Sequence, residues 1–296
     1  MMPQQGERRL TIREMCAWGE VSRASYHRWH EASAPREAEL MLREAMQEQC
    51  LAHRFYGRRR IRALLVREGF VVSERRVGHL MGEDNLLCVR RGKFVLATTD
   101  SDHAYGIYPN LAPFFQVTGI HQLWVADITY VRLREEFVYL AVVLDVYSRR
   151  AIGWSVGRNL TAEVALQALR QALADRPPPQ MHHSDRGAQY ACQAYVELLA
   201  AAKITISMSR PARPWDNAYC ESFIKTLKAE QLDGSKFARL EDFAPHLPRF
   251  LDESYNEERL HSALGYRSPA EFERALAAAA PLPPPAKTKP PGGGVK

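Results

Sequence analysis

The spacing of apolar residues is helical in the first third of the chain. Residues 10–29 predict two short helices around a turn at Gly19, with Ser22 as the cap of the second. Further helical spacing covers residues 36–53, then Leu64 to Val66, and a helix starts after Ser73. Two helices joined by a short turn are the pattern of helix-turn-helix units. We therefore predict an N-terminal region made only of helices.

After residue 116 the pattern changes to alternating and fully apolar runs, which indicate strands. Three consecutive strands are expected, followed by alternating helices and strands. The strands are expected at residues 123–131, 137–146, 151–156, 181–184 and 204–208, and the helices from Thr161 to Leu173 and at residues 190–202 and 216–232. This order predicts an α/β fold, a mixed sheet with helices packed against it.

These patterns divide the 296 residues into five expected parts. They are a helix-turn-helix-like segment at 1–35, a second helical DNA-binding unit at 36–92, a linker at 93–116, a mixed-sheet core at 117–276, and a disordered tail rich in Ala, Pro and Gly at 277–296.

The positive charge is confined to the first third. Residues 1–95 hold 18 Lys and Arg against 12 Asp and Glu, whereas the rest of the chain holds 22 of each. Lys and Arg gain free energy by displacing counterions from phosphates, so this bias favours binding of a polyanion by the helical region. An ordinary solvated basic surface is the alternative reading of the charge.

Composition narrows the setting further. The five cysteines include no CxxC pair, which favours a reducing compartment. The loose set His27, His30, Cys50 and His53 resembles an ordinary packed helix end more than a zinc site, so no zinc is expected. No apolar run reaches the length of a membrane span, and the N-terminus has no apolar signal core. We therefore expect a cytoplasmic protein, with no membrane partner.

Three acidic residues fall at the edges of the predicted sheet. Asp127 lies inside the first strand, Asp185 follows the strand at 181–184, and Glu221 lies one turn into the last helix. Carboxylates that converge from separate elements are typical ligands of Mg²⁺, which prefers oxygen donors and leaves positions open for phosphate. Taken alone, a buried aspartate such as Asp127 could equally well be a structural residue or a metal ligand. Asp145 closes a strand before a turn and is interpreted as structural.

The spacing of the three acids resembles that of the DDE transposase and retroviral integrase superfamily. The second acid follows the first by 58 positions, and 35 residues separate the second from the third. The residues around the three acids resemble one subgroup in particular, the catalytic, second-reading-frame (OrfB-type) product of bacterial insertion sequences. This resemblance covers residues 10–275. The residues that carry it are Trp124-Val-Ala-Asp-Ile-Thr-Tyr130, Asp145-Val-Tyr-Ser-Arg-Arg150, His183-Ser-Asp-Arg-Gly-Ala-Gln-Tyr190, Asp216-Asn-Ala-Tyr-Cys-Glu221 and Tyr255-Asn…Arg259-Leu-His…Leu264-Gly-Tyr-Arg-Ser-Pro269.

This resemblance implies a ribonuclease H-like core in which Asp127, Asp185 and Glu221 are the catalytic, metal-binding triad. It implies two Mg²⁺ ions per active site, with Mn²⁺ as a substitute, and water or a DNA 3′-hydroxyl as nucleophile. The partners that it implies are the DNA of element ends and target, further copies of the chain, and a small upstream-frame protein of the same element, all in the bacterial cytoplasm. The implied function is metal-dependent cleavage and transfer of DNA strands.

Several further residues are candidates for DNA contact. Lys225 and Lys228 follow Glu221 by four and seven positions on one helical face, and the family favours a basic residue at the second of these positions. Arg213 and Trp215 precede that helix, with Trp215 a candidate for base stacking. Arg75 and Arg76 begin the helix after Ser73, where a recognition helix meets DNA, and Arg58 and Arg59 lie in the preceding basic run. There are alternatives to DNA contact for these residues. The two lysines could belong to an ordinary solvated helix face, and Trp215 could anchor the helix by hydrophobic packing.

Two other functions are compatible with parts of this sequence. A DNA-binding regulator or transposition inhibitor would have a silent core, and a metal-dependent nuclease would cut without joining; the triad is common to nuclease and transposase. His182 and His183 are adjacent in a strand, so they point to opposite faces and do not chelate one ion.

Overall fold

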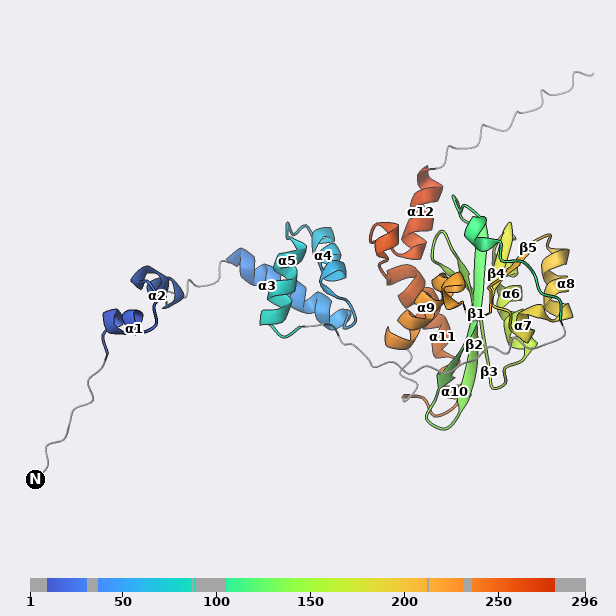
Figure 1. Ribbon diagram of the computed structural model, residues 1–296, viewed down its shortest axis with the longest axis horizontal. Coiled ribbons are helices and arrows are strands. Elements are labelled where there is room, and N and C mark those ends of the chain that lie inside the picture. The colour runs from blue at the N-terminus through green and yellow to red at the C-terminus, as the bar shows by residue number, and fades with distance from the viewer. Residues whose placement is uncertain are drawn as a thin grey trace, which may run out of the picture. The chain divides into compact units, whose positions relative to one another are not determined.

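The computed structural model describes residues 10–30, 37–86, 88, 105–211, 213–230 and 236–279. The chain forms two compact units, Met1–Cys88 and Val89–Lys296 (Figure 1). Our expectations for residues 93–104 and for 280–296 lie outside the described residues. No helix in the described ranges is long and apolar enough to cross a membrane.

The first unit contains five helices within its described residues. They are α1 (Ile12–Trp18), α2 (Arg23–His30), α3 (Glu37–Ala52), α4 (Arg58–Arg67) and α5 (Glu74–Glu83). The predicted cap Ser22 accepts a hydrogen bond from the Ser25 N–H at 3.0 Å, and Ser73 caps α5 in the same way through Arg76. Between α4 and α5, Gly69 has a φ of +94°, a left-handed conformation that favours glycine.

The apolar stripe predicted for α1 is largely exposed. Only Cys16 of this helix is buried, and Trp18 is 85% exposed. By contrast, α3, α4 and α5 enclose a small core of fully buried side chains, Met46, Ile61, Leu65, Val77 and Leu80. The pattern at residues 10–18 therefore predicted the helix correctly, but it did not predict that the apolar face of this helix would be exposed.

The second unit is built on a five-stranded sheet in the order β3-β2-β1-β4-β5. The strands are β1 (Leu123–Arg132), β2 (Phe137–Asp145), β3 (Ala151–Gly157), β4 (Met181–Ser184) and β5 (Thr205–Met208). The first three are antiparallel, and β4 and β5 run parallel to β1. The predicted mixed sheet is confirmed, because tight turns join β1 to β2 and β2 to β3 whereas helices connect the later strands.

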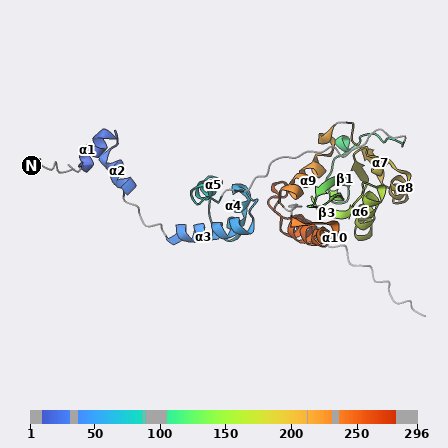
Figure 2. The same cartoon turned by 90° about the horizontal axis from the view of Figure 1, so that it is seen from below.

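Helices cover both faces of the sheet (Figures 1 and 2). One face packs against α6 (Ala162–Asp175), α7 (Ala188–Ala191) and α8 (Gln193–Ala201). The other packs against α9 (Ala218–Glu230), α10 (Leu240–Phe243), α11 (His246–Pro248) and the π-helical segment η4 (Arg249–Glu258). The chain then passes through η5 (Ser262–Leu264) to α12 (Pro269–Ala279).

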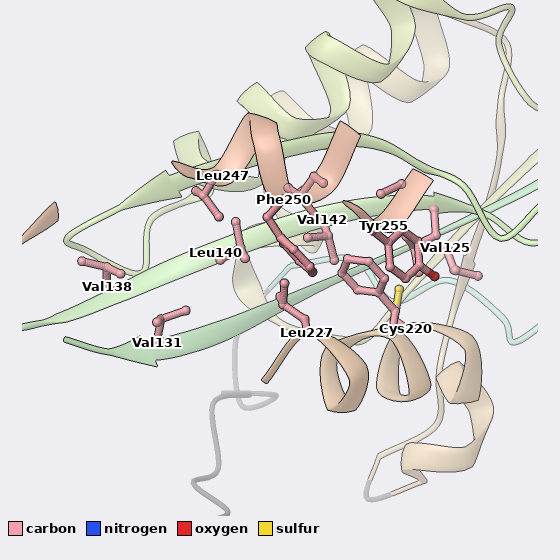
Figure 3. Packing of buried hydrophobic residues seen from close by; sticks show 14 of the residues in the cluster. Val125, Val131, Val138, Leu140, Val142, Cys220, Leu227, Leu247, Phe250 and Tyr255 are labelled. Atoms are coloured by element: carbon pink, nitrogen blue, oxygen red, sulfur yellow. The ribbon is translucent and has the colours of Figure 1, made fainter. Parts of the chain in front are cut away.

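Alternation along β1 explains this two-sided burial. Trp124, Ala126 and Ile128 pack on the α6 side, and Val125 and Val131 pack on the α9 side. Figure 3 shows the α9 side, where Cys220 and Leu227 meet Phe250 and Tyr255 of η4 against the strands. The core therefore fixes α9 to the sheet.

The helix α6 lies unusually close to the edge strand β3. A Cβ atom placed on Gly153 would stand 2.2 Å from the carbonyl oxygen of Ala168. No side chain fits in that space, so glycine is required for this contact between helix and strand.

Side-chain amides occupy the outer edge of β3. Asn256 accepts a hydrogen bond from Ala151 N–H at 3.0 Å and donates one to the Ala151 carbonyl at 2.8 Å. Gln171 accepts from the Trp154 N–H at 2.8 Å. Both backbone groups of Ala151 and the N–H of Trp154 are therefore satisfied, although the described residues place no further strand beside β3.

Three expected elements differ in detail. The helix expected at 190–202 is two helices, because Cys192 is extended between α7 and α8. The helix expected from residue 216 begins as a 3₁₀ turn, η2 (Pro214–Asn217), and becomes α-helical at Ala218. Within the expected linker, residues 105–116 contain the 3₁₀ turn η1 (Ala112–Phe114), and Leu111 and Phe115 pack against the core.

Candidate active site

The sheet register brings the first two acids together. β4 pairs in parallel with β1, and Val125 lies opposite His183. Asp127 and Asp185 each follow these partners by two residues, so they emerge side by side where β4 ends and β1 continues. Asp127 is held within β1 opposite Val142 of β2.

Glu221 is brought to the same place by the anchoring of α9. The side-chain amide of Asn217 donates to the Ala126 carbonyl at 2.9 Å, which ties the start of the helix to β1 beside Asp127. Cys220, Phe223 and Leu227 are buried against the sheet. Glu221 therefore lies on a flank of the helix, one turn above this anchor.

The electrostatics show that the three carboxylates share one region. Burial raises the pKa of Asp127 to about 8, and the neighbouring carboxylates of Asp185 and Glu221 raise it as well. The Ile128 N–H bond and the Lys228 ammonium oppose the rise. Like charges gathered in this way are stabilised by a cation, and the donors are all oxygens, which fits a hard divalent ion.

Each carboxylate also has a partner within the chain. Oδ1 of Asp127 accepts from Ile128 N–H and Oδ1 of Asp185 from Gly187 N–H, both at 2.9 Å, and Glu221 pairs with Lys225 at 2.8 Å. Among the described residues, no group of three or more His, Cys, Asp or Glu side chains is arranged to hold a metal ion. Joint coordination of one ion would therefore require these side chains to move closer together.

The raised pKa of Asp127 predicts how stability depends on pH without metal. From about pH 4 to 8 the folded chain keeps a proton that the unfolded chain loses, so the free energy of unfolding falls as pH rises. Asp127→Asn removes this penalty. We expect the variant to be more stable than wild type by about 1–3 kcal/mol at pH 8.5 and equally stable at pH 4, the partial exposure of Asp127 limiting the gain.

Urea unfolding in EDTA across this pH range measures the difference. Asp175→Asn, at an exposed position at the end of α6, is the control and should follow wild type. Parallel curves for Asp127→Asn and wild type would contradict the pKa assignment.

The two lysines of α9 differ in their surroundings. Lys225 is exposed and paired with Glu221. Lys228 is half-buried, with its Nζ 4.0 Å from the centre of the Tyr130 ring; burial lowers its pKa and the Asp127 charge opposes this. Both candidates therefore lie on the flank of α9 that carries Glu221.

The loop before α9 is closed by an ion pair that the sequence did not predict. Asp216 accepts two hydrogen bonds from the Arg210 guanidinium at 2.9 Å, and its Oδ2 also accepts from Asn110 at 2.8 Å. The Arg210 side chain is the main cause that lowers the pKa of Asp216 to about 2. Asp216 and Asn217, which lie just before the α-helix, bind Arg210 of the loop and Ala126 of β1. Asn110 precedes Asp216 by 106 positions, so no local signal identifies the pair.

This loop presents Trp215 and Arg213 to solvent. Trp215 is 57% exposed, and the Arg213 guanidinium lies 4.9 Å from its ring centre. The exposure disfavours the anchoring role and leaves an aromatic face with a cation beside it, as in base-stacking sites.

In the first unit, three of the four candidate arginines are ion-paired. Arg58 and Arg59 both contact Glu74, and Arg76 contacts Glu39. Arg75 is exposed in the first turn of α5. All four lie on α4 and α5, the pair joined by the turn at Gly69.

Three other buried polar residues have structural roles. Asp145 is fully buried and accepts from the backbone N–H groups of His121, Tyr147 and Ser148. His182 contacts Tyr195, whereas His183 contacts Ser207 and Ser209, so the two rings point to opposite faces as predicted. Burial lowers the pKa of His182 to about 3 and that of His183 to about 4, which leaves both neutral.

Comparison with protein families agrees with this architecture. Residues 118–214 and 202–269 match models described as "Integrase core domain", and residues 36–94 match one described as "HTH-like domain". The second unit is thus an integrase core, and the second helical stretch of the first unit is helix-turn-helix-like.

Among similar curated proteins is the uncharacterized 31 kDa protein of insertion element IS600 from Shigella sonnei. It is 36% identical over 264 residues, which cover 87% of this chain and 97% of that protein. The transposase of IS904 from Lactococcus lactis is 33% identical over 74% of this chain and 87% of its own length. The transposase InsF of IS3A from Escherichia coli K12 is 31% identical over 89% and 94%. The chain belongs to this family of insertion-sequence transposases, and is an enzyme of the transposase and integrase class.

Solved integrases also match the chain, at low identity. The magnesium complex of the HTLV-2 integrase catalytic core (trimeric form) is 16% identical, with a TM-score of 0.41 over 51% of this chain and 95% of that one. The catalytic core of BIV integrase is 21% identical, with a TM-score of 0.40 over 54% and 98%.

Proposed function

We propose that this transposase cleaves and joins DNA strands with divalent cations held by Asp127, Asp185 and Glu221. The observation that carries the proposal is the convergence of the three carboxylates from β1, the end of β4 and α9, expressed in the raised pKa of Asp127. Two ions, Mg²⁺ with Mn²⁺ as a substitute, would activate the attacking oxygen and stabilise the leaving one.

The chain's own residues would position these groups. Asn217 holds the start of α9 on β1, so Glu221 stays level with Asp127. Asp185, whose Oδ1 accepts from the Gly187 N–H, would hold the cation together with Glu221. Glu221 would give up its contact with Lys225, and Lys225 would then bind a DNA phosphate beside the site.

DNA would be held by basic and aromatic residues of both units. We assign phosphate contacts to Lys225, Lys228, Arg213 and the arginines of α4 and α5, Arg58, Arg59, Arg75 and Arg76, and base stacking to Trp215. Element ends and a target duplex are the two substrates. Work on two DNA ends favours an oligomer of this chain, and an upstream-frame protein of the element is the further partner that we propose.

The contribution of Lys228 is testable through salt. Lys228→Ala is expected to weaken DNA binding, and to lower the magnitude of the slope of log affinity against log salt concentration by about one unit, because one phosphate contact is lost. Fluorescence anisotropy at several salt concentrations measures this slope. Arg170→Ala, at an exposed position on α6, is the matched control. An unchanged slope for Lys228→Ala would mean that Lys228 contacts no phosphate and belongs to a solvated helix face.

A joining assay tests the proposal as a whole. Labelled element-end DNA and a second duplex are incubated with the full chain and Mg²⁺ or EDTA, and nicked and joined products are scored separately. Joined product that requires Mg²⁺ supports the proposal. Nicking without joining would identify a nuclease, and binding without either product, also when the upstream-frame protein is added, would identify a regulator with a silent core.

A further inference from the structure

Two aromatic rings lie side by side on the outer half of the hairpin formed by β1 and β2. Tyr130 of β1 and Phe137 of β2 have their ring centres 6.4 Å apart, with the ring planes inclined by 58°. Tyr130 is 8% exposed, whereas Phe137 is 45% exposed. Phe137 therefore offers aromatic surface to solvent beside a ring that packing holds in place.

A cation stands at each end of this pair of rings. The Lys228 ammonium lies 4.0 Å from the centre of the Tyr130 ring, and the Arg132 guanidinium carbon lies 5.4 Å from the centre of the Phe137 ring. Arg132 is exposed and sits opposite Phe137 in the register of the two strands. Cations at such distances are attracted to the ring electrons. We call Lys228, Tyr130, Phe137 and Arg132 the hairpin strip.

The cations of the hairpin strip are not neutralised by carboxylates. Within the part of the chain that the structure describes, neither Arg132 nor Lys228 forms an ion pair with Asp or Glu, and each contacts a ring instead. The two acids of the hairpin turn, Glu135 and Glu136, are each bound by another arginine. The charge of the strip is therefore positive and complementary to phosphate groups.

The hairpin strip begins at the candidate active site. Tyr130 follows Asp127 by three residues and Arg132 follows it by five, which are about 10 and 17 Å along a strand. β4 pairs with β1 only as far as Val125, so no described strand lies beside the β4-facing edge of β1 from Asp127 onward. Lys228 belongs to α9, which covers the face of the sheet opposite Tyr130, and its side chain reaches the ring past this open edge.

We propose that the hairpin strip binds unpaired nucleotides of the DNA strand next to the cleaved phosphodiester, with Phe137 stacking on a base and Arg132 and Lys228 contacting phosphates. The inference rests on the proposed function, because the triad determines where the strand is cut. A path of about 17 Å accommodates at most about five nucleotides at 3.4 Å each. Every base has a π face, so such a surface binds a single strand of any sequence. A closed duplex keeps its bases stacked on one another and offers none to Phe137.

The test compares two fluorescent duplexes, one blunt and one that ends in five unpaired thymidines, placed at the 3′ or the 5′ end. Binding to the full chain is measured by anisotropy in EDTA, which prevents cleavage. For one of the two polarities we expect wild type to bind the overhang duplex about 10-fold more tightly than the blunt one, and Phe137→Ala to lose this preference. Arg132→Ala should lower the magnitude of the salt slope for the overhang duplex by about 0.7, the value of one single-strand phosphate contact.

Matched variants separate stacking from general effects. Phe114→Ala removes a phenylalanine of η1 that is 88% exposed, and Arg170→Ala removes an exposed arginine of α6; both should bind the two duplexes like wild type. Phe137→Trp keeps an aromatic surface and should keep the preference for the overhang. Thermal unfolding of Phe137→Ala should match that of wild type, since the ring it removes is half-exposed.

Three results would overturn the inference. One is equal binding of the blunt and overhang duplexes by wild type, and another is an unchanged preference in Phe137→Ala. The third is a change of oligomeric state in Phe137→Ala, which would make the hairpin strip an interface between copies of this chain. Asp185→Asn distinguishes these from failure of the proposed function. Wild-type cleavage by Asp185→Asn contradicts the triad, whereas loss of its cleavage together with an unchanged preference in Phe137→Ala contradicts the hairpin strip alone.

Discussion

Asp185→Asn is expected to reduce strand cleavage and joining by about 1,000-fold or more while the chain stays folded. Loss of one carboxylate from a metal site removes several kcal/mol of transition-state stabilisation, and each 1.4 kcal/mol is tenfold in rate. The fold should tolerate the change, because the amide oxygen of asparagine still accepts from the Gly187 N–H.

Cleavage of labelled end DNA and thermal unfolding are measured on the same preparation. Asp175→Asn, at an exposed position, serves as the control for loss of an acidic side chain and should keep full activity. Wild-type cleavage by Asp185→Asn would refute the assignment of the triad, and a collapsed unfolding transition would mean that Asp185 is needed for folding instead.

Glu230→Gln is expected to lower the free energy of unfolding by about 3 kcal/mol. Glu230 ends α9 and binds the Arg259 guanidinium through both oxygens, at 2.6 and 2.8 Å, and only 7% of the Arg259 side chain is exposed. Without the carboxylate this buried charge loses its compensation, which is the costly way to break such a pair. Activity should fall as well, because the contact fixes the far end of the helix that carries Glu221.

Chemical denaturation provides the measurement, and a second ion pair provides the control. Arg249 and Glu253 pair at 3.7 Å with both side chains largely exposed, so Glu253→Gln should cost less than about 0.5 kcal/mol. The double variant Glu230→Leu with Arg259→Met should recover much of the stability, because the buried charge is then gone. If Glu230→Gln and Glu253→Gln lowered the free energy of unfolding equally, burial of the Glu230–Arg259 pair would not contribute to its effect on stability.

The elements of the core were predictable because their signals are local. Alternation and apolar runs located all five strands within one or two residues, and β4 at residues 181–184 without error. The turn at Gly69 and the caps at Ser22 and Ser73 were predictable for the same reason, since each depends on residues a few positions apart.

The contacts that build the candidate site were not predictable in this way. Asp127 meets Asp185 through the register of β1 with β4, which no single segment encodes. The side-chain amide of Asn217 donates a hydrogen bond to the carbonyl of Ala126, 91 positions earlier, and Asp216 accepts one from Asn110. Resemblance supplied the identities of the acids, whereas the structure supplies the contacts that position them, such as that of Asn217 with Ala126.

The amides along β3 bear on how copies of this chain associate. An open edge strand is a template on which a second molecule can continue the sheet, a common route to aggregation. Here Asn256 uses both outward backbone groups of Ala151, and Gln171 uses the N–H of Trp154. Copies of the chain are thereby kept from pairing strand to strand at these positions, so continuation of the sheet from one molecule to the next is disfavoured.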